Sequence, residues 1–550
     1  MNTADLIDAL LNPETYPHPV DLITTIETHI SIVFLTGPYA YKLKKPVDFG
    51  FLNFSTIQLR KKFCELELTL NRRTAPQLYL GIDKIVKQGS NIHLTPLTKG
   101  KSSNDKSSQD SSHSVNEDTV DYLVKMKQFN PNDVLGRMLG ESSLNEDMIS
   151  ALTEQIANFH KMAQPVELNT EYGEPKIQLQ PMLDNFPSLS QYFSDSATQQ
   201  KLTSLLAWTN QEFSIHKQNL KERKQNGFVK ACHGDLHLDN ITLIDNQPVL
   251  FDGIEFNEYF RWIDVMSDLA FLLIDLDFRK QFATSYKILS QYLTQTLDYK
   301  GLYLLNFYRV YRTMVRAKIT ALRAEQLPLN SLEQKCIEQT ALSYIDQAIG
   351  YTQPNNNVPK QKPKCILLQG VSGSGKSYFA NQLLDELGDF KAIILSSDRI
   401  RKTLFGIDAH HRVSEEEKQQ LYSNEMNRKT YKALADNAKI CMDLGFNVIL
   451  DATFLKRHHR ETIHQVAKTC SADYFVFSLL STIETAKQSI NLRQKLNNNP
   501  SDATINVMLN QLKQVEEPRA DENALLININ ELRQRFPKES IQEFLNLPIK

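Results

Sequence analysis

The chain has 550 residues, and at about 150 residues per domain this length predicts more than one domain. A hydrophobic fraction of 41% with 23% charged residues is typical of globular proteins and excludes a fibrous or wholly disordered chain. The net charge of −2 argues against a dedicated nucleic-acid or acidic-membrane binder, and no apolar run reaches the roughly 20 residues of a membrane helix.

In the first 350 residues, predicted strands precede predicted helices. Three short runs rich in β-forming residues are the predicted strands, at residues 31–35, 39–43 and 91–97. Three longer runs carry apolar residues at helical spacing, at residues 144–162, 198–222 and 302–323. A strand-rich lobe followed by a helix-rich lobe predicts a two-lobed α+β domain.

Two stretches lack the periodicity of regular structure. Residues 99–118 contain almost no apolar residue, which predicts a solvated, disordered loop. Because strand-like runs at 91–97 and 119–126 flank this loop, we interpret it as the loop of an elongated hairpin. Residues 351–364 are rich in Pro, Asn and Lys and form the predicted linker. The chain then divides into a domain at 1–350 and a domain at 365–550.

Strands and helices alternate after the linker. The predicted strands lie at 365–369, 391–396, 446–450 and 474–479, with a helix at 376–387. A second, long helix is expected to start near Ser414, which forms a capping-box pattern with Glu417. Continuous apolar strands in this order predict an α/β domain with a parallel sheet that is covered on both faces.

A phosphate-binding loop follows the first of these strands. The sequence GVSGSGKS fits the pattern G-x-x-x-x-G-K-[ST] between a strand and a helix, with a glycine-rich turn as the structural alternative. Its glycines let backbone N–H groups point at phosphate oxygens, and the helix amino terminus adds positive charge. Lys376 is expected to neutralise the β- and γ-phosphates of ATP, and Ser377 to bind Mg²⁺. The predicted ATP-binding residues of the loop are Gly370, Ser372, Gly373, Ser374, Gly375, Lys376 and Ser377.

Two other strands of this domain lead into an acid. Asp398 follows the strand at 391–396, and Asp451 follows the strand at 446–450. Ligands of open parallel sheets bind at the carboxyl ends of the strands, so both carboxylates are expected to face the nucleotide. Asp451 suits a Walker-B ligand of the Mg²⁺ shell. Asp398 is placed to deprotonate an acceptor hydroxyl, with a purely structural helix cap as the alternative.

This region resembles small P-loop kinases related to gluconate kinase, zeta toxins and polynucleotide 5′-kinases. The resemblance rests on the loop at 370–377, on SDRIRK at 397–402 and on DAT at 451–453. It implies that Asp398 is the catalytic base and that Arg401 binds the acceptor or its phosphate. It also implies that Arg493 is an ATP-binding lid arginine, for which an exposed helical arginine is an equal alternative.

A second motif, HGDLHLDN at 233–240, lies before the linker. Asp235 and Asn240 have the five-residue spacing of the kinase catalytic loop, where a carboxylate orients the acceptor hydroxyl and an amide holds Mg²⁺. We therefore assign Asp235 as catalytic and Asn240 as a metal ligand. Asp252, twelve residues later, follows a short apolar strand and matches the metal-binding acid of a DFG motif. His237 is either part of this site or a packing residue.

The motif and about residues 30–345 around it resemble the aminoglycoside phosphotransferase family, which has a protein-kinase-like fold. The resemblance implies that a strand lysine contacts the α- and β-phosphates of ATP, and we favour Lys42 over Lys44. It further implies that Glu67 is the helical partner of this lysine and that Met126 ends a hinge against which adenine packs. Only Gly37 precedes Lys42 where the family has a glycine-rich loop.

Several acids follow Asp252, including Glu255, Asp264 and Asp268. They either bind a cationic acceptor such as an aminoglycoside or pin the catalytic loop through ion pairs, including pairs with arginines of the helix at 302–323. We favour the ion pairs.

These observations together predict a bifunctional ATP- and Mg²⁺-dependent phosphotransferase. Each domain would transfer the γ-phosphate to a hydroxyl of a small molecule. The tandem resembles bacterial proteins described as an aminoglycoside phosphotransferase-like domain fused to an ATP-binding protein. One alternative is a nucleotide-binding regulator with one or both sites inactive, and another is a nucleic-acid end kinase in the second domain, against which the composition argues. Six scattered cysteines and the absence of a signal-peptide pattern favour the cytoplasm, and no membrane partner is expected.

Overall fold

The computed structural model describes most of the chain and divides it into two compact units. The first unit comprises Met1–Ser143, Asn158–Pro181 and Lys217–Phe271, and the second comprises Leu144–Ala157, Met182–His216 and Leu272–Lys550. The predicted loop at 99–118 and most of the predicted linker lie outside the described residues. The described residues are 3–50, 52–89, 91–97, 119–139, 144–353, 362–387, 391–408, 411, 413–496, 501–534 and 536–547.

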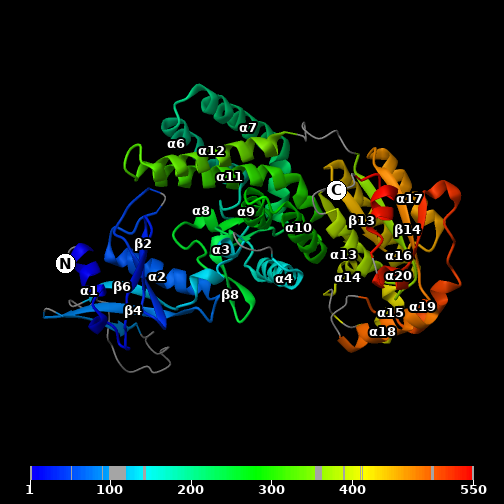
Figure 1. The fold of residues 1–550 in the computed structure, drawn as a ribbon, viewed down its shortest axis with the longest axis horizontal. Coiled ribbons are helices and arrows are strands. Elements are labelled where there is room, and N and C mark those ends of the chain that lie inside the picture. The colour runs from blue at the N-terminus through cyan, green and yellow to red at the C-terminus, as the bar shows by residue number, and fades with distance from the viewer. Residues whose placement is uncertain are drawn as a thin grey trace. The chain divides into compact units, whose positions relative to one another are not determined.

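The first unit is built on a six-stranded antiparallel sheet. In sheet order its strands are β1 (Thr24–Glu27), β2 (Ser31–Leu35), β3 (Tyr39–Lys44), β6 (Thr119–Lys127), β4 (Tyr79–Gln88) and β5 (Asn91–Pro96). Helix α2 (Ile57–Asn71) begins after Thr56, whose side chain caps it, and packs against β4 and β6 (Figure 1). The strands predicted at 31–35, 39–43, 91–97 and 119–126 are present.

The predicted hairpin between 91–97 and 119–126 is wrong. Strand β4 lies between β5 and β6 in the sheet and pairs with both, so β5 and β6 are not neighbours. Strand β4 was not predicted, because Gly81, Asp83 and Lys84 interrupt its apolar pattern. A register shift between Tyr79 and Gly81 accommodates that interruption.

Two short antiparallel strand pairs complete the first unit. Strands β7 (Val229–Ala231) and β10 (Trp262–Asp264) pair with each other, as do β8 (Ile241–Ile244) and β9 (Gln247–Leu250). Asp245 and Asn246 join β8 to β9 with positive φ angles of 50° and 59°, as a two-residue hairpin turn requires. The motif at 233–240 lies between β7 and β8, and Asp252 follows β9. These short pairings therefore bring the two predicted acids of this site toward each other.

The helices predicted at 144–162, 198–222 and 302–323 are confirmed as α4 (Glu146–Met162), α7 (Ser196–Gln225) and α11 (Leu302–Glu325). Helix α11 packs along α12 (Leu332–Thr352), and apolar residues of α6, α7, α11 and α12 form one buried cluster. The other helices before the linker are α1 (Thr3–Leu10), α3 (Leu135–Met138), α5 (Pro175–Leu183), α6 (Asn185–Tyr192), α8 (Glu258–Arg261), α9 (Val265–Phe278) and α10 (Phe282–Thr296).

The carboxyl-terminal part of the second unit contains a five-stranded sheet whose strands are all parallel. In sheet order they are β12 (Ala392–Ser396), β13 (Asn447–Asp451), β11 (Lys364–Gln369), β14 (Asp473–Leu480) and β15 (Ala524–Asn528). The first four were predicted. Strand β15 was not predicted: its apolar run at 524–527 is only four residues long, and only one of its five side chains is buried.

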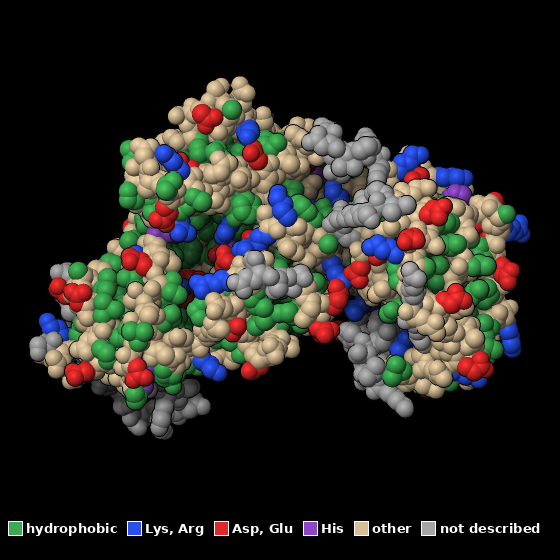
Figure 2. All heavy atoms as spheres, viewed as in Figure 1, with side chains coloured by type: hydrophobic (Ala, Val, Ile, Leu, Met, Phe, Trp, Pro, Cys, Tyr) green, Lys and Arg blue, Asp and Glu red, His purple; other side chains and the backbone are tan. Residues whose placement is uncertain are grey.

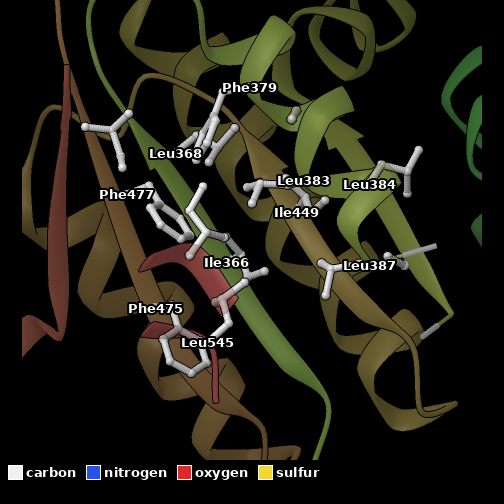
Figure 3. Close-up of a cluster of buried hydrophobic side chains, with 14 of the residues drawn as sticks. Ile366, Leu368, Phe379, Leu383, Leu384, Leu387, Ile449, Phe475, Phe477 and Leu545 are labelled. Atoms are coloured by element: carbon white, nitrogen blue, oxygen red, sulfur yellow. The ribbon is translucent and has the colours of Figure 1, made fainter. Parts of the chain in front are cut away.

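Helices cover this parallel sheet on both faces. Ile366 and Leu368 of β11 face a core that includes Phe379 and Leu383 of α13 (Lys376–Glu386) and Leu545, directly after α21 (Lys538–Phe544) (Figure 3). The alternate residues of the same strand are also buried, while α16 packs against β12 and β13. The helices after the linker are α13 (Lys376–Glu386), α14 (Ser397–Phe405), α15 (Glu415–Leu421), α16 (Asn424–Asp443), α17 (Arg457–Thr469), α18 (Ile483–Leu496), α19 (Ile505–Leu512), α20 (Ile529–Gln534) and α21 (Lys538–Phe544).

The single long helix predicted from Ser414 is two helices. Ser414 and Glu417 do form the predicted capping box at the start of α15. Helix α15 ends at Leu421, and the Ser423 side chain then accepts a hydrogen bond from the Met426 N–H and caps α16. A serine that satisfies a free backbone N–H favours such a break over a continuous helix.

The predicted fold class is confirmed. An α+β, protein-kinase-like arrangement of an antiparallel sheet followed by helices precedes an α/β P-loop arrangement with a parallel sheet. Charged side chains of both signs are interspersed over the visible face, in keeping with the net charge of −2 (Figure 2). Within the described residues, every helix is too short or too polar to cross a membrane.

Candidate active sites

Strand β3 places Lys42 at the centre of a buried charge cluster in the first unit. The Lys42 Nζ lies 2.6 Å from Asp252 Oδ1 and 3.0 Å from Glu67 Oε1 on α2. Burial opposes the charge of Lys42, but Asp252 and Glu67 outweigh it and hold the pKa of the lysine well above its usual value. Burial likewise acts against ionised Glu67, yet Lys42 and Lys44 lower its pKa to about 2. Lys42 is thus a fixed cation beside two carboxylates.

The loop that carries Asp252 is tied to α2 and β4. Gly253 N–H donates to Asn71 Oδ1 at 2.7 Å, and Asp252 N–H donates to the Tyr79 hydroxyl at 3.1 Å. Asp252 has a φ of 60°, which turns the chain sharply after β9. The Asp252 side chain remains 41% exposed, so one face of its carboxylate is open to a ligand.

The catalytic loop holds Asp235 and Asn240 in direct contact. The Asn240 Nδ2 donates to Asp235 Oδ2 at 2.9 Å and to the Asp235 carbonyl oxygen at 2.9 Å. This contact uses the amide nitrogen, so the amide oxygen of Asn240 is directed elsewhere. Phe251 N–H donates to the Asn240 carbonyl at 3.0 Å, which places Asn240 next to the segment that carries Asp252. The oxygen atoms of Asn240 and Asp252 are the donor type that Mg²⁺ prefers.

Buried polar contacts pin this loop from behind. Asp268 on α9 accepts hydrogen bonds from the N–H groups of His233 and Gly234 at 3.0 and 2.9 Å and contacts His160 Nε2 at 3.1 Å. The His237 ring lies 3.3 Å from Asp235 Oδ2 and packs against Phe271. His237 therefore both touches the predicted catalytic acid and packs in the core.

The other acids after Asp252 also have structural partners within the first unit. Asp264 pairs with Arg223, and Glu255 pairs with Lys44. These contacts favour the ion-pair interpretation over binding of a cationic acceptor. Within the first unit, the acids of this segment pair with Arg223, Lys44 and His160.

Met126 lies near the end of β6, which is a central strand of the sheet. It is half-buried on β6, where it pairs with Ala40 of β3, and it packs with a cluster that includes Phe129 and Phe251. This apolar wall is where the resemblance placed adenine. The turn before β3 is short, with Gly37 at a φ of 94° and Thr36 N–H bonded to the Tyr39 carbonyl at 2.9 Å.

The phosphate-binding loop of the second unit joins β11 to α13, the predicted context. The Lys376 Nζ folds back over the loop and donates to the carbonyl oxygens of Gly370 and Val371, both at 2.9 Å. Burial lowers the pKa of Lys376 to about 8, against the opposing effect of Asp451. The nearby Arg493 also lowers it, so α18 brings that residue toward the loop. Ser374 is fully buried inside the loop.

Close packing around the loop fixes its shape. The Gly373 Cα lies so near α18 that a Cβ there would stand 2.6 Å from the Ala486 carbonyl oxygen. The Ser372 N–H donates to Gln511 Oε1 of α19 at 2.7 Å. Val371 packs with Ala486, Ile490 and Met508. Helices α18 and α19 thus brace the loop on one side.

Ser377 and Asp451 meet at the carboxyl ends of neighbouring strands. The Ser377 Oγ donates to Asp451 Oδ2 at 2.7 Å, and β13, which ends at Asp451, pairs directly with β11. Burial raises the pKa of Asp451, while Lys376 and Ser377 oppose that rise. A hydroxyl and a carboxylate in contact near Lys376 fit a Mg²⁺ site.

Helix α14 carries Asp398 and Arg401 on successive turns. Asp398 is half-buried, and no described residue forms a hydrogen bond or ion pair with its carboxylate. Arg401 is buried, donates to the Leu421 carbonyl and to Asn427 Oδ1, and stacks over Tyr422. Asp398 is therefore available to a ligand, whereas two donor groups of Arg401 already have protein partners.

Two polar residues near the two sites, Asn71 and Gln511, were not predicted to act there. Lys44 was the alternative to Lys42 as the strand lysine, and Glu255 was expected to form ion pairs that pin the loop at 233–240. Asn71 and Gln511 act from helices far away in the chain. No local pattern marks either of them.

The chain is similar to several known proteins. Residues 365–518 match the family model described as AAA domain. An uncharacterized protein of Mycobacterium tuberculosis is 26% identical over 494 residues, which are 89% of this chain and 90% of the relative.

Two solved structures are similar to different parts of the chain. A choline/ethanolamine kinase family protein from Mesorhizobium loti, 9% identical, covers 64% of this chain and 95% of its own, with a TM-score of 0.38. A sugar kinase from Janibacter, 18% identical, covers 34% of this chain and 95% of its own, with a TM-score of 0.25. The family model matches the part of the chain in which a P-loop domain was predicted. The strand order of the first sheet agrees with the kinase-like fold predicted before it.

Proposed function

We propose that the protein is an ATP-dependent phosphotransferase with two active sites, each of which transfers the γ-phosphate to a hydroxyl of a small molecule. The observation that carries the proposal is the contact between Asn240 and Asp235 beside the loop of Asp252, because this is the arrangement that phosphoryl transfer requires. The contact of Ser377 with Asp451 at the phosphate-binding loop supports the second site.

In the first site, Lys42 would bind the α- and β-phosphates, and Asn240 and Asp252 would hold Mg²⁺. Asp235 would orient the acceptor hydroxyl and accept its proton. Bound Mg²⁺ would neutralise charge that develops on the transferred phosphoryl group. The chain itself supplies positioning, since Asp268 and Asn71 fix the two loops from behind.

In the second site, the N–H groups of residues 372–377 and Lys376 would hold the phosphates of ATP. Ser377 and Asp451 would hold Mg²⁺, and Arg493 would reach the phosphates from α18. Asp398 is proposed as the base because its carboxylate has no described hydrogen-bond partner, and Arg401 as the neighbouring acceptor-binding group. The location of Asp398 at the carboxyl end of β12 supports this role.

The second candidate function is a nucleotide-binding regulator whose first site transfers no phosphate. The tight turn at Gly37 favours this alternative, because it replaces a glycine-rich loop that would cover the phosphates. The two functions differ in whether ATP is consumed when acceptors are supplied.

The experiment is an ATP-consumption screen of the full chain against a panel of sugars, amino alcohols, aminoglycosides and other hydroxyl compounds. Asp235→Ala and Lys376→Ala are each expected to abolish a different activity. Asp436→Ala and Lys439→Ala, which remove exposed charges from α16, are the matched controls and are expected to retain both activities. If neither site variant changes the turnover of any acceptor while ATP still binds, the regulator function replaces the transferase.

Small-molecule acceptors are the proposed partners, with no membrane or nucleic-acid partner. The cytoplasm remains the proposed compartment. All six cysteines are free thiols, and four of them are buried, which supports a reducing environment.

A further inference from the structure

A second buried ion pair lies behind Lys42 and has no role in the proposed chemistry. Lys44 lies two residues farther along β3, and its side chain is 1% exposed. Its Nζ lies 2.5 Å from Glu67 Oε2 and also contacts Glu255, which lies in the loop after Asp252. The Phe54 ring covers the same ammonium group at 4.8 Å. Water is therefore excluded from the Lys44 contacts.

The two lysines divide the carboxylates between them. Glu67 uses one oxygen for each lysine, Asp252 contacts Lys42, and Glu255 contacts Lys44. The ion pair of Lys42 with Asp252 can be exchanged for a contact with a ligand, because the Asp252 side chain is 41% exposed. The ion pair of Lys44 with Glu255 is closed to ligands, because the Glu255 side chain is only 5% exposed. The cluster holds three carboxylates for two lysines, so one negative charge is left over for a cation.

We propose that Lys44 and Glu255 are positioning residues of the first site: their buried ion pair holds the loop of Asp252 against β3 and leaves Lys42 free to exchange Asp252 for a phosphate. This inference rests on the proposed function of that site. It adds to that function a pair of residues that determines how nucleotide binding at the first site depends on Mg²⁺.

The carboxylates of Glu67 and Glu255 explain why Lys42 could not bind a phosphate without Lys44. Without Lys44, Glu67 Oε2 and Glu255 would be buried carboxylates with Lys42 as the nearest described cation on the strand. Lys42 would then turn away from the phosphate position to neutralise them. Burial raises the pKa of Glu255 and Lys44 opposes the rise, so loss of Lys44 also favours a neutral Glu255.

The position of Glu255 explains the link to Mg²⁺. Gly253 is tied to Asn71 of α2 on one side of Ile254, and Glu255 is tied to Lys44 of β3 on the other. These two anchors fix the direction of the Asp252 carboxylate, which lies just before them. Residues that orient a metal ligand in this way change metal affinity about 10- to 100-fold when they are lost.

The test measures ATP binding by the full chain in a Lys376→Ala background, which removes the contribution of the second site. A fluorescent ATP analogue is titrated with and without Mg²⁺, and the melting temperature is recorded for every variant. The variants are Glu255→Gln and the double variant Lys44→Met/Glu255→Gln, which removes one charge of each sign and so avoids an unpaired buried charge. Lys42→Met removes the lysine proposed to bind phosphate and serves for comparison. The control is Lys45→Met, which breaks the exposed ion pair of Lys45, the residue after β3, with Glu27.

Glu255→Gln and the double variant are expected to raise the Mg²⁺ concentration at half-saturation by about tenfold or more, and to change the Mg²⁺-free affinity less than about twofold. Lys42→Met is expected to weaken nucleotide binding with and without Mg²⁺, and Lys45→Met to change neither. The inference is overturned if Glu255→Gln and the double variant lower only the melting temperature. If the parent and Lys42→Met both fail to bind nucleotide, the proposed function of the first site falls and this inference falls with it.

Discussion

The two candidate sites would bind phosphate by different physical means. The first relies on side-chain charges that lie on separate elements: Lys42 on β3, Glu67 on α2 and Asp252 after β9. The second relies on one continuous loop whose backbone N–H groups and single lysine lie between β11 and α13. A site assembled from distant charges depends on ion pairs that hold those charges in place. A site built into a loop depends on the close packing that gives the loop its shape.

The protonation of the two lysines follows the same contrast. Lys42 lies between two carboxylates that hold its pKa well above the ordinary value. Lys376 lies among carbonyl oxygens in a buried loop that lowers its pKa to about 8. Both lysines would bind phosphates of ATP. Before ATP binds, however, the pKa of Lys42 is raised and the pKa of Lys376 is lowered.

The sharpest way to test the comparison is to remove the proposed base of each site. Asp235→Asn and Asp398→Asn are each expected to lower phosphoryl transfer at their own site about 10²- to 10⁴-fold, because general-base catalysis contributes about that much. Single-turnover transfer from labelled ATP measures the effect. ATP affinity should stay within about threefold, since the base does not hold the nucleotide. Equal loss at both sites from either variant would show that the sites act as one.

Glycine-to-alanine substitutions should affect the closely packed loop of the second site more than the open turn of the first site. Gly373→Ala places a Cβ 2.6 Å from the Ala486 carbonyl oxygen at a φ of 86°, whereas Gly37→Ala, at a φ of 94°, meets no described atom within 4 Å. Gly373→Ala is expected to cost about 1–3 kcal/mol and weaken ATP binding at the second site more than about tenfold. Gly37→Ala should cost only about 1–2 kcal/mol from backbone strain. Denaturant unfolding and ATP titration check both, and comparable losses would contradict the contrast.

The pH dependence of ATP binding should differ between the sites. Bound phosphate raises the pKa of Lys376 above its value of about 8 in the free protein, so binding takes up a proton above that pH. Affinity at the second site is therefore expected to be constant below pH 8 and to fall up to about tenfold per unit above it. Affinity at the first site should stay constant to about pH 10, because the pKa of Lys42 is already raised.

Calorimetry in the Lys42→Met and Lys376→Ala backgrounds isolates the second and the first site, respectively. Parallel titrations in two buffers of different ionisation enthalpy give the proton uptake directly. A fall in affinity of the same steepness at both sites would contradict the assigned lysine environments.

The smallest expected effect concerns nucleic acids. With a net charge of −2 and phosphate groups held by local loops, the chain is expected to show no steep loss of oligonucleotide binding between 50 and 200 mM salt, where a protein with about six phosphate contacts loses about 10³-fold. Fluorescence anisotropy with a 5′-hydroxyl oligonucleotide measures the slope. A steep slope that disappears in Arg401→Ala would support an end kinase in place of a small-molecule kinase.

The sequence predicted those features whose residues are neighbours in the chain. The loop at 370–377 and the spacing of Asp235 and Asn240 are local patterns, and a strand on one side of each places them in three dimensions. The pairing of Lys42 with Glu67 came from the family resemblance, and the structure brings the two together at 3.0 Å. The roles of these residues remain proposals.

The features that escaped prediction depend on contacts between distant segments. Strand β4 is recognised by its two sheet partners rather than by its own apolar pattern, and β15 by its pairing with β14. Asn71 binds the Gly253 N–H from α2, and Gln511 binds the Ser372 N–H from α19. The two partners of such a contact are far apart in the chain, so no short sequence pattern indicates that they meet.

The strand order of the parallel sheet has a consequence for how the second site forms. The central strand β11 carries the phosphate-binding loop, yet its two neighbours are β13 and β14 rather than the next strand in the chain. Because Lys364 pairs with Asp473, roughly a hundred residues must be gathered before this pairing closes, and such long-range pairing is slow. ATP, by binding only the completed loop, would then favour the folded state by mass action. Cellular nucleotide levels would thus influence what fraction of the folded chains opens far enough to be cut by proteases.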